Sequence, residues 1–569
     1  SHWHFKRTQH ASAMRINPRS FKRSFLGLIL VSGLFLAFSN PGDRFFEIAK
    51  NLDIYATVFK ELNTYYVDEV DPKKSIETSI EALLKSFDPY TVYYPESEID
   101  EFLQMTTGKY QGIGIILSDI NQSHRISFIE ENSPANKAGL GIGDQIISIN
   151  GTKLGETPET DPAVLMKGSA GSIVNIEVLQ VGKSTPQTFS IKRETVQIKN
   201  VVNASIIRPG VGYILLEDFN ASAAKEVKTA LLELKKQGMQ KLILDLRNNP
   251  GGLLTQAIDV CNLFIPKGSK IVETRGKVEE WNKSYQALNQ AIDTETPIIV
   301  LINNRTASAA EIVAGVLQDY DRAVIMGQKS FGKGLVQVTR DLPYRTKMKI
   351  TTAKYYIPSG RCIQALDYKN KNADGTAKVY QDSLANVFYT KNGRKVVDGG
   401  GILPDQPTDK KPLSAFAQAL LSKEMFFLFA SDFHGSNSTI GSAENFAVNA
   451  EILSQFNVWL TKARFTYEAP VENQVKKLLE STREQPEYSE LQQLLQAQSG
   501  HWKTNLEREL KLHAQEITPL LEQEIIMHYY LQKGLNTWST RKDPSILAAI
   551  DLLSKPTKFA SILSRREKP

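Results

Sequence analysis

Short apolar runs alternate with stretches of helical periodicity from Val211 to about Ile350, and this pattern constrains the fold more than any other feature of the sequence. Apolar, strand-like runs cover 212–217, 241–246 and 297–303, and others lie near Val324, Leu335 and Ile350. Helical periodicity covers 221–237, a stretch that begins at 253, and 308–317. Strands that alternate with helices indicate an α/β sheet with crossover helices.

The rest of the chain differs in texture, and its 569 residues exceed what one hydrophobic core usually serves. Apolar residues recur at helical spacing before about residue 106, short β-branched runs between turn residues fill about 108–198, and the segment after Pro412 is helical in pattern. We therefore predict a multidomain α/β protein. Its parts are a helical N-terminal region (41–106), an inserted β-rich domain (107–197), an α/β core (198–411) and an α-helical C-terminal domain of unassigned role (412–569).

The N-terminal segment 14–40 has the layout of a signal peptide or a membrane anchor. Four cations precede an apolar run at 25–38, and the sequence Asn40-Pro41-Gly42-Asp43 closes it. The run is short for a spanning helix, and small residues before Asn40 suit signal cleavage. Cleavage and anchoring both stay open, and either implies export.

Charge and cysteine content narrow the function classes. Lys and Arg number 68 against 62 Asp and Glu, an excess too small to indicate a nucleic-acid partner. The two cysteines, Cys261 and Cys362, have no metal-ligand spacing, so we expect no metal site. A disulfide between them stays open.

The β-rich domain contains the glycine motif Tyr110-Gln111-Gly112-Ile113-Gly114-Ile115, followed by Ser133-Pro134-Ala135 and the run 143–151. These three ordered motifs resemble a PDZ domain. The resemblance implies that Gly112, Ile113, Gly114 and Ile115 bind the carboxylate and backbone of a C-terminal peptide tail.

Two strand-to-helix turns in the α/β core could carry acyl-transfer chemistry. The first holds Gly251 and Gly252, whose backbone amides are candidate oxyanion donors. The second holds Ser308, followed by Ala309, whose amide could also face a developing oxyanion. Ser308 is a candidate nucleophile, although Ser308 or Thr306 as an ordinary helix cap is the alternative interpretation.

A serine nucleophile needs a base, and none of the eight histidines lies between Ile198 and Phe433. A lysine can replace histidine if burial lowers its pKa from about 10.4 to roughly 7 to 8. Lys333 is the candidate, because it lies between Gly332 and Gly334 at the start of an apolar run.

Together these segments resemble the carboxyl-terminal processing peptidases, also called tail-specific proteases, from about residue 45 to 410. Further matches are Asp88-Pro89-Tyr90-Thr91, the run 356–361 and the run 401–405. The resemblance implies a serine endopeptidase with Ser308 as nucleophile, Lys333 as base and Gln337 orienting the lysine, without metal or organic cofactor.

It also implies substrates that are exported proteins with apolar C-terminal tails, on the periplasmic side of an inner membrane. The chain departs from several members of the family at Lys167-Gly168, where they have Arg-Gly. Lysine does not replace arginine at a bidentate contact, which puts coupling between the PDZ domain and the catalytic site through Lys167 in doubt. Oligomerisation, adaptor docking and substrate caging are the alternatives for 412–569.

Two rival functions remain. Ser330-Phe331-Gly332-Lys333 fits the Ser-x-x-Lys nucleophile motif of penicillin-binding proteins and β-lactamases, but the glycines disfavour the helix which that motif needs. The other rival is a PDZ scaffold, or a conditionally inactive pseudo-protease, that binds tails without cutting them.

Overall fold

The computed structural model describes residues 41–155, 161–380, 385–408 and 412–564. The predicted signal or anchor segment, 14–40, lies outside these residues. Residues up to Leu83 and residues from Leu84 onward form two compact units. Within the described part of the chain, no helix combines the length and the apolar character needed to cross a membrane.

The first unit is helical, as the sequence predicts. It contains α2 (Pro41–Tyr65) and most of α3 (Pro72–Lys85). Asp71 caps α3 by accepting hydrogen bonds from the amides of Lys73 and Lys74. The apolar side chains of α2, such as Leu52 and Val58, are exposed. In the second unit, α4 (Ile99–Thr107) continues the helical region.

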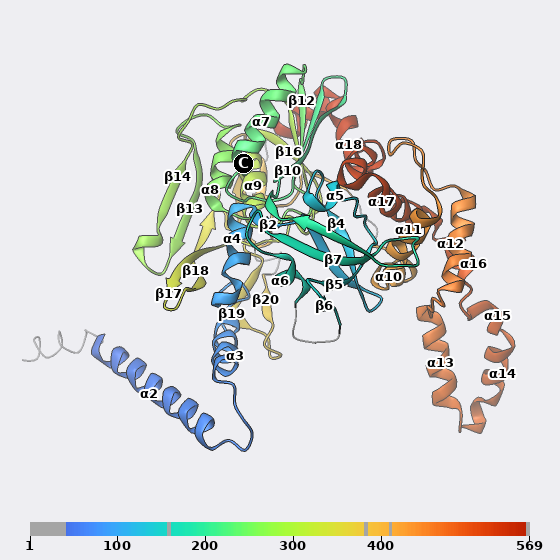
Figure 1. Cartoon of the computed structure of the whole chain (residues 1–569). Coiled ribbons are helices and arrows are strands. Elements are labelled where there is room, and N and C mark those ends of the chain that lie inside the picture. Colours follow the sequence, from blue (N-terminus) through green and yellow to red (C-terminus); the bar gives the residue numbers. More distant parts are fainter. Residues whose placement is uncertain (1–40, 156–160, 381–384, 409–411, 565–569) are drawn as a thin grey trace, which may run out of the picture. The chain divides into compact units, whose positions relative to one another are not determined.

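The second unit contains a six-stranded sheet, which confirms the predicted α/β core (Figure 1). The strand order is β10 (Val201–Arg208), β11 (Val211–Leu216), β12 (Lys241–Asp245), β15 (Ile298–Ile302), β16 (Ala323–Gly327) and β23 (Gln406–Pro407). All neighbours are parallel except β10 and β11. All five residues of β15 are buried, as expected of a parallel strand covered on both faces.

Different helices cover the two faces of this sheet. One face packs on α7 (Ala223–Lys236), α8 (Leu254–Asn262) and α9 (Ala309–Asp319). The other packs on α18 (Pro544–Leu553) and α19 (Pro556–Ser564), where Ile546 and Leu552 meet Tyr213 and Leu301. Part of segment 412–569 therefore shares one hydrophobic core with segment 198–411.

A second, antiparallel sheet contains β1 (Val92–Tyr94), β13 (Lys270–Gly276), β14 (Lys283–Gln286), β17 (Leu335–Leu342) and β18 (Thr346–Tyr356). The sequence interpretation placed the strands near Leu335 and Ile350 in the α/β sheet. They pair instead with each other, because the short turn at Tyr344 and Arg345 joins them without a crossover helix.

The inserted domain is β-rich, as predicted. Its main sheet has the order β3 (Ile115–Ile120), β4 (Ser123–Ile129), β5 (Gln145–Ile149), β7 (Ile173–Leu179) and β8 (Gln187–Lys192), with β6 (Thr152–Lys153) beside β5. A separate pair is β2 (Lys109–Gly112) with β9 (Glu194–Gln197). Two short helices, α5 (Pro134–Lys137) and α6 (Pro162–Met166), complete the domain. Strand β3 lies at the sheet edge.

The segment after Pro412 is helical, as predicted. It comprises α10 (Ala415–Ser422), α11 (Met425–Ser436), α12 (Ala450–Lys462), α13 (Pro470–Thr482), α14 (Ser489–Ala497), α15 (Ser499–Trp502), α16 (Leu506–Leu512), α17 (Ala514–Lys542), α18 and α19. Phe427 of α11 packs in the core of the β-rich domain, and Asn536 of α17 donates a hydrogen bond to the carbonyl of Val202 in β10. These helices thus contact both the inserted domain and the α/β core.

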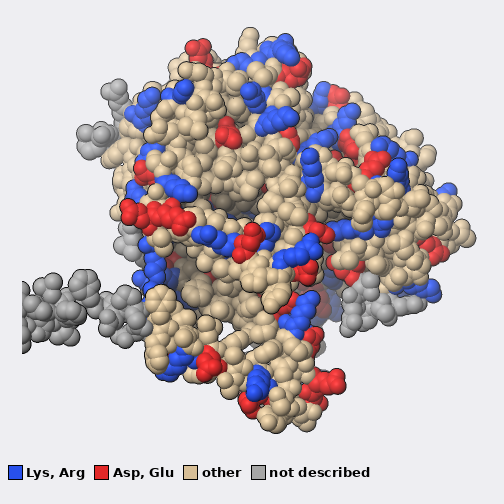
Figure 2. Space-filling model, turned by 60° about the vertical axis from the view of Figure 1, so that its left-hand side comes forward, with Lys and Arg blue, Asp and Glu red and all other residues tan. Residues whose placement is uncertain are grey.

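Cys261 and Cys362 are free thiols. Figure 2 shows Lys and Arg side chains interspersed with Asp and Glu over the face in view, in keeping with the small net charge of +6.

Candidate active site and peptide-binding site

Ser308 lies where the chain leaves β15 and enters α9. It directly precedes the helix, so the helix-cap position and the proposed nucleophile position coincide. Its backbone has φ 53° and ψ −116°, a conformation that costs a non-glycine residue free energy and is typical of functional turns. Thr306 is fully buried and donates its hydroxyl to the carbonyl of Leu246, so it supports the turn.

Gly251 packs directly against Ser308, which brings the two predicted turns together. A Cβ atom on Gly251 would lie 2.8 Å from Ser308 Cβ and 2.8 Å from the amide nitrogen of Ala309, so only glycine fits. The amide of Gly251 donates to Asn249 Oδ1 at 2.8 Å. The amides of Gly252 and Ala309 donate to no acceptor among the described residues, and they are therefore the free donors of the predicted oxyanion set.

The buried carboxylate of Glu311 joins the serine turn to the lysine loop. One oxygen, Oε2, accepts the amides of Ser308 at 2.8 Å and Lys333 at 2.9 Å; the other accepts the amide of Gly332 and the hydroxyl of Ser330. Burial raises the pKa of Glu311, and these four hydrogen bonds oppose the rise. The sequence analysis did not predict that Glu311 joins these two segments. The signal that could have found it is the Ser-x-x-Glu spacing of Ser308 and Glu311, which is typical of a capping box.

Lys333 is half-buried in the loop before β17. Burial, and then the charge of Lys349, lowers its pKa to about 8, while Glu311 and Asp88 act in the opposite direction. Its Nζ lies 4.3 Å from the centroid of the Tyr90 ring. Among the described residues no hydrogen bond joins Lys333 to Ser308, so the proton-transfer contact is not made in this conformation.

The glycines beside Lys333 are required by close packing. Gly332 has φ 87°, and a Cβ there would lie 2.5 Å from Ala365 Cβ. A Cβ on Gly334 would lie 2.8 Å from the amide nitrogen of Gln364. Both positions must therefore be glycine, so that the lysine loop can approach residues 364–365.

Ser330, the serine of the rival Ser-x-x-Lys motif, is only 5% exposed. Its hydroxyl donates to Glu311 and accepts the amide of Ile402 at 2.6 Å. A hydroxyl enclosed and paired in this way supports the loop and is poorly placed to attack a substrate.

Gln337 lies in β17 and donates its amide group to Thr351 Oγ1 at 3.1 Å. Within the described part of the chain it makes no hydrogen bond to Lys333. Its predicted role in orienting the lysine stays a prediction.

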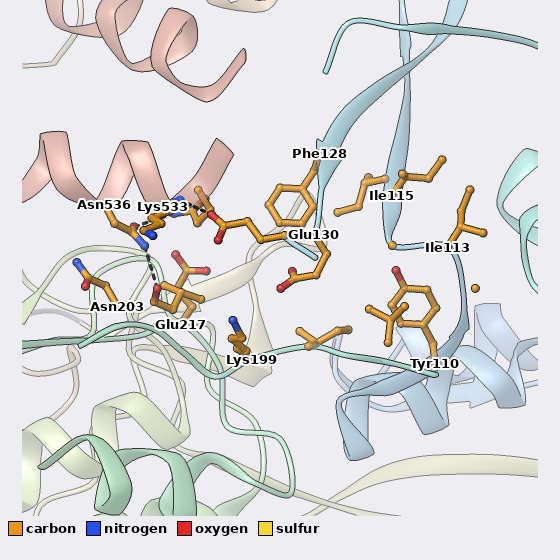
Figure 3. Close-up of a pocket in the computed structure, with 18 of the residues that line it drawn as sticks. Tyr110, Ile113, Ile115, Phe128, Glu130, Lys199, Asn203, Glu217, Lys533 and Asn536 are labelled. Atoms are coloured by element: carbon orange, nitrogen blue, oxygen red, sulfur yellow. Dashed lines mark hydrogen bonds between the residues drawn. The ribbon is translucent and has the colours of Figure 1, made fainter. Parts of the chain in front are cut away.

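The predicted peptide-binding loop borders a cavity of about 1250 Å³. Figure 3 shows Tyr110, Ile113 and Ile115 on one side of this cavity and Asn203, Lys533 and Asn536 on the other. Strand β3, which holds Ile115, is an edge strand and can pair with an extended peptide. The site is therefore walled by the inserted domain, by β10 and by α17.

Each residue of the Gly-x-Gly motif has a distinct place. Gly114 has φ 85°, and a Cβ there would lie 2.2 Å from Ser133 Cβ. A Cβ on Gly112 would lie 2.9 Å from the Tyr110 ring. The Ile113 side chain is buried in the core of the inserted domain, so only its backbone is available to a ligand. Burial, and then Glu130, raises the pKa of Tyr110 to about 12, against the opposing effect of the Gly114 amide.

Lys167 directly follows α6 and lines the same cavity. Among the residues described, its side chain forms no ion pair or hydrogen bond with the Ser308 site. The adjacent Gly168 packs against the guanidinium of Arg193, which donates to the carbonyls of Met166 and Leu165 at the end of α6. The proposed coupling through Lys167 stays a prediction.

An α/β core with a serine at a strained strand-to-helix turn, joined to a PDZ domain, defines a PDZ-containing serine peptidase. Three protein-family profiles match the chain: "Peptidase family S41" over residues 210–369, "PDZ domain" over 111–192, and "Probable PDZ-protease, C-terminal helical domain" over 416–553. The chain belongs to peptidase family S41, and its relatives there are carboxy-terminal-processing proteases.

Two relatives support the assignment to this family. The carboxy-terminal-processing protease of Bartonella bacilliformis is 35% identical over 321 residues, which are 56% of this chain and 73% of that protein. The carboxyl-terminal-processing protease of Synechocystis is 38% identical over 295 residues, 51% of this chain and 68% of that protein.

Among solved structures, the photosystem II D1 C-terminal processing protease is 26% identical. The match covers 62% of this chain and 92% of that one, with a TM-score of 0.32, too low for an argument from the superposition.

Proposed function

We propose that this serine peptidase recognises the C-terminal tails of exported proteins through its PDZ domain and cuts them with Ser308 and Lys333. The observation that carries the proposal is the shared carboxylate of Glu311, which accepts the backbone amides of both residues. Nucleophile and base are thereby fixed to one buried group.

In the proposed reaction, neutral Lys333 takes the proton of the Ser308 hydroxyl while Oγ bonds to the scissile carbonyl carbon. The amides of Gly252 and Ala309 stabilise the oxyanion. As the tetrahedral intermediate collapses, the C–N bond breaks and Lys333 gives its proton to the leaving amine. A water molecule, deprotonated by the same lysine, then hydrolyses the acyl-enzyme.

The bound tail would add a strand to β3, with its carboxylate at the backbone amides of the loop 112–115. Apolar C-terminal side chains suit the cavity, whose lining includes Ile115, Phe128 and Val196. We place the substrates, and the enzyme, on the periplasmic side of an inner membrane, on the strength of the sequence at 14–40. We also propose that the protein acts with a partner, either an adaptor protein or a second copy of the chain.

One observation favours a second candidate, a conditionally inactive state. Lys333 makes no hydrogen bond to Ser308 among the described residues, and catalytic hydrogen bonds often tighten only when substrate binds. Tail binding would then shift the population toward a competent arrangement.

Digestion of an unfolded protein with an apolar C-terminus tests the proposal, beside the same protein with an amidated tail. We expect Ser308→Ala and Lys333→Ala to be inactive, and the exposed control Ser436→Ala to match the wild type. Amidation should slow cleavage, because it removes the terminal carboxylate. Cleavage by Ser308→Ala, or equal rates for both tails, would contradict the proposal, and an inert wild type would favour the conditionally inactive state.

A further inference from the structure

The turn Asp88-Pro89-Tyr90-Thr91 has no role in the reaction proposed above, yet it is tightly built. The buried carboxylate of Asp88 accepts the amides of Tyr90 and Thr91, both at 2.8 Å, and the Thr91 hydroxyl at 3.1 Å. These three bonds fix the backbone from which the Tyr90 side chain extends.

A second aromatic residue holds the Tyr90 ring. The Tyr368 ring, in β19 (Leu366–Lys371), meets it edge-on at a centroid distance of 5.9 Å and an interplanar angle of 89°. The Tyr368 hydroxyl also donates to the Tyr90 hydroxyl at 3.3 Å. Tyr90 is therefore held through its backbone and through its hydroxyl, and the face of its ring is turned toward Lys333.

Lys333 Nζ lies over this ring at 4.3 Å from its centroid, within the range of a cation–π contact. Other charged groups also act on Lys333: Lys349 of β18, Glu311 of α9 and Asp88 of the turn itself. Since the described residues give Lys333 no ion pair or hydrogen bond from its Nζ, the ring is the group in direct contact with its charge.

We propose that Tyr90 is a positioning residue for the general base, whose ring face binds the ammonium form of Lys333 and stabilises the charge that develops when Ser308 attacks. The inference rests on the proposed function, because the ammonium matters to catalysis only if Lys333 accepts the serine proton. A ring quadrupole attracts the ammonium more strongly than the neutral amine. The contact therefore favours the state in which the proton has moved.

The test compares proteins that differ only in the ring's electron density. Tyr90 is replaced by phenylalanine and, by nonsense suppression, by 4-fluoro-, 3,5-difluoro- and 3,4,5-trifluorophenylalanine. These side chains are nearly isosteric, but each fluorine weakens the negative ring face. The exchange Tyr93→Phe, in the neighbouring strand, is the control.

The protonation of Lys333 is read without reference to activity. The protein is treated with trace 2,4-dinitrofluorobenzene across a pH series, and the modified Lys333 peptide is quantified by mass spectrometry. Only the neutral amine reacts, so the midpoint reports the lysine's own proton equilibrium. We expect the midpoint to fall with each fluorine, by about 0.5 pH unit from phenylalanine to the trifluoro side chain, and the acid limb of the peptidase profile to move with it.

A midpoint that is the same across the fluorinated series would overturn the inference. The inference would also be overturned if the midpoint of Lys333 modification moves in an active enzyme while the acid limb of its peptidase pH profile does not. If Ser308→Ala or Lys333→Ala still cleaves substrate while the midpoint falls with fluorination, the proposed function fails and the contact with Tyr90 stands. The two failures are therefore distinguishable.

Discussion

Replacing the buried Glu311 with glutamine should lower both the free energy of unfolding and the rate of hydrolysis. The glutamate carboxylate is fully buried and accepts four hydrogen bonds, two on each oxygen. Glutamine retains one acceptor oxygen and turns an NH2 group toward the other two donors, which are left buried and unpaired. Each such donor costs about 1–3 kcal/mol, so the free energy of unfolding should fall by about 2–6 kcal/mol.

Catalysis should suffer as well, because the lost bonds position the backbone of Ser308 and Lys333. A misplacement of about 1 Å costs roughly 10²-fold in rate, and we expect kcat to fall on that order. Urea unfolding and peptide hydrolysis measure the two effects, with Glu233→Gln as control because Glu233 lies exposed on α7 beside Lys236. The reasoning is refuted if Glu311→Gln unfolds and hydrolyses like Glu233→Gln.

Three further outcomes follow from the structure. Gly251→Ala should abolish hydrolysis, since its Cβ would lie 2.8 Å from Ser308 Cβ at a φ of 96°; hydrolysis above about 1% of wild type would contradict this. The hydrolysis rate should rise with pH through a midpoint near the Lys333 pKa of about 8, because only the neutral amine takes a proton; a profile flat from pH 6 to 9 would count against it. Asp543→Asn, which weakens the bonds that Arg247 donates to both Asp543 oxygens at 3.0 and 2.9 Å, should lower the unfolding free energy by about 1–2 kcal/mol in urea; an unchanged midpoint would show that the contact is dispensable.

The α/β pattern was predictable from the sequence where local and long-range signals agree. The apolar run at 297–303 became β15, and the stretch at 308–317 became α9, because a buried parallel strand and its crossover helix have distinct periodicities. The approach of Gly251 to Ser308 followed from the same pattern, since parallel strands place their carboxyl ends at one edge of a sheet.

Contacts between elements that are distant in the sequence were harder to predict. Periodicity shows that α18 has an apolar face but not that Ile546 packs on Tyr213, which precedes it by more than three hundred residues. The strands β17 and β18 have ordinary strand composition, so their sequence did not distinguish an antiparallel pair from membership of the α/β sheet. Tyr90 was noted as part of a motif, but nothing local to it identifies Lys333 as its neighbour.

Because the chain is synthesised from its N-terminus, the packing of α18 and α19 on the sheet has a consequence for folding. Strands β11 to β16 emerge long before residues 544–564, so one face of the finished sheet has no cover until the last helices arrive. Domains generally fold as units, and an uncovered apolar sheet is a poor scaffold for a strained turn such as that of Ser308. A nascent chain, or one truncated before residue 544, would therefore contain Ser308 and Lys333 and still lack the helices that cover one face of the sheet beneath them.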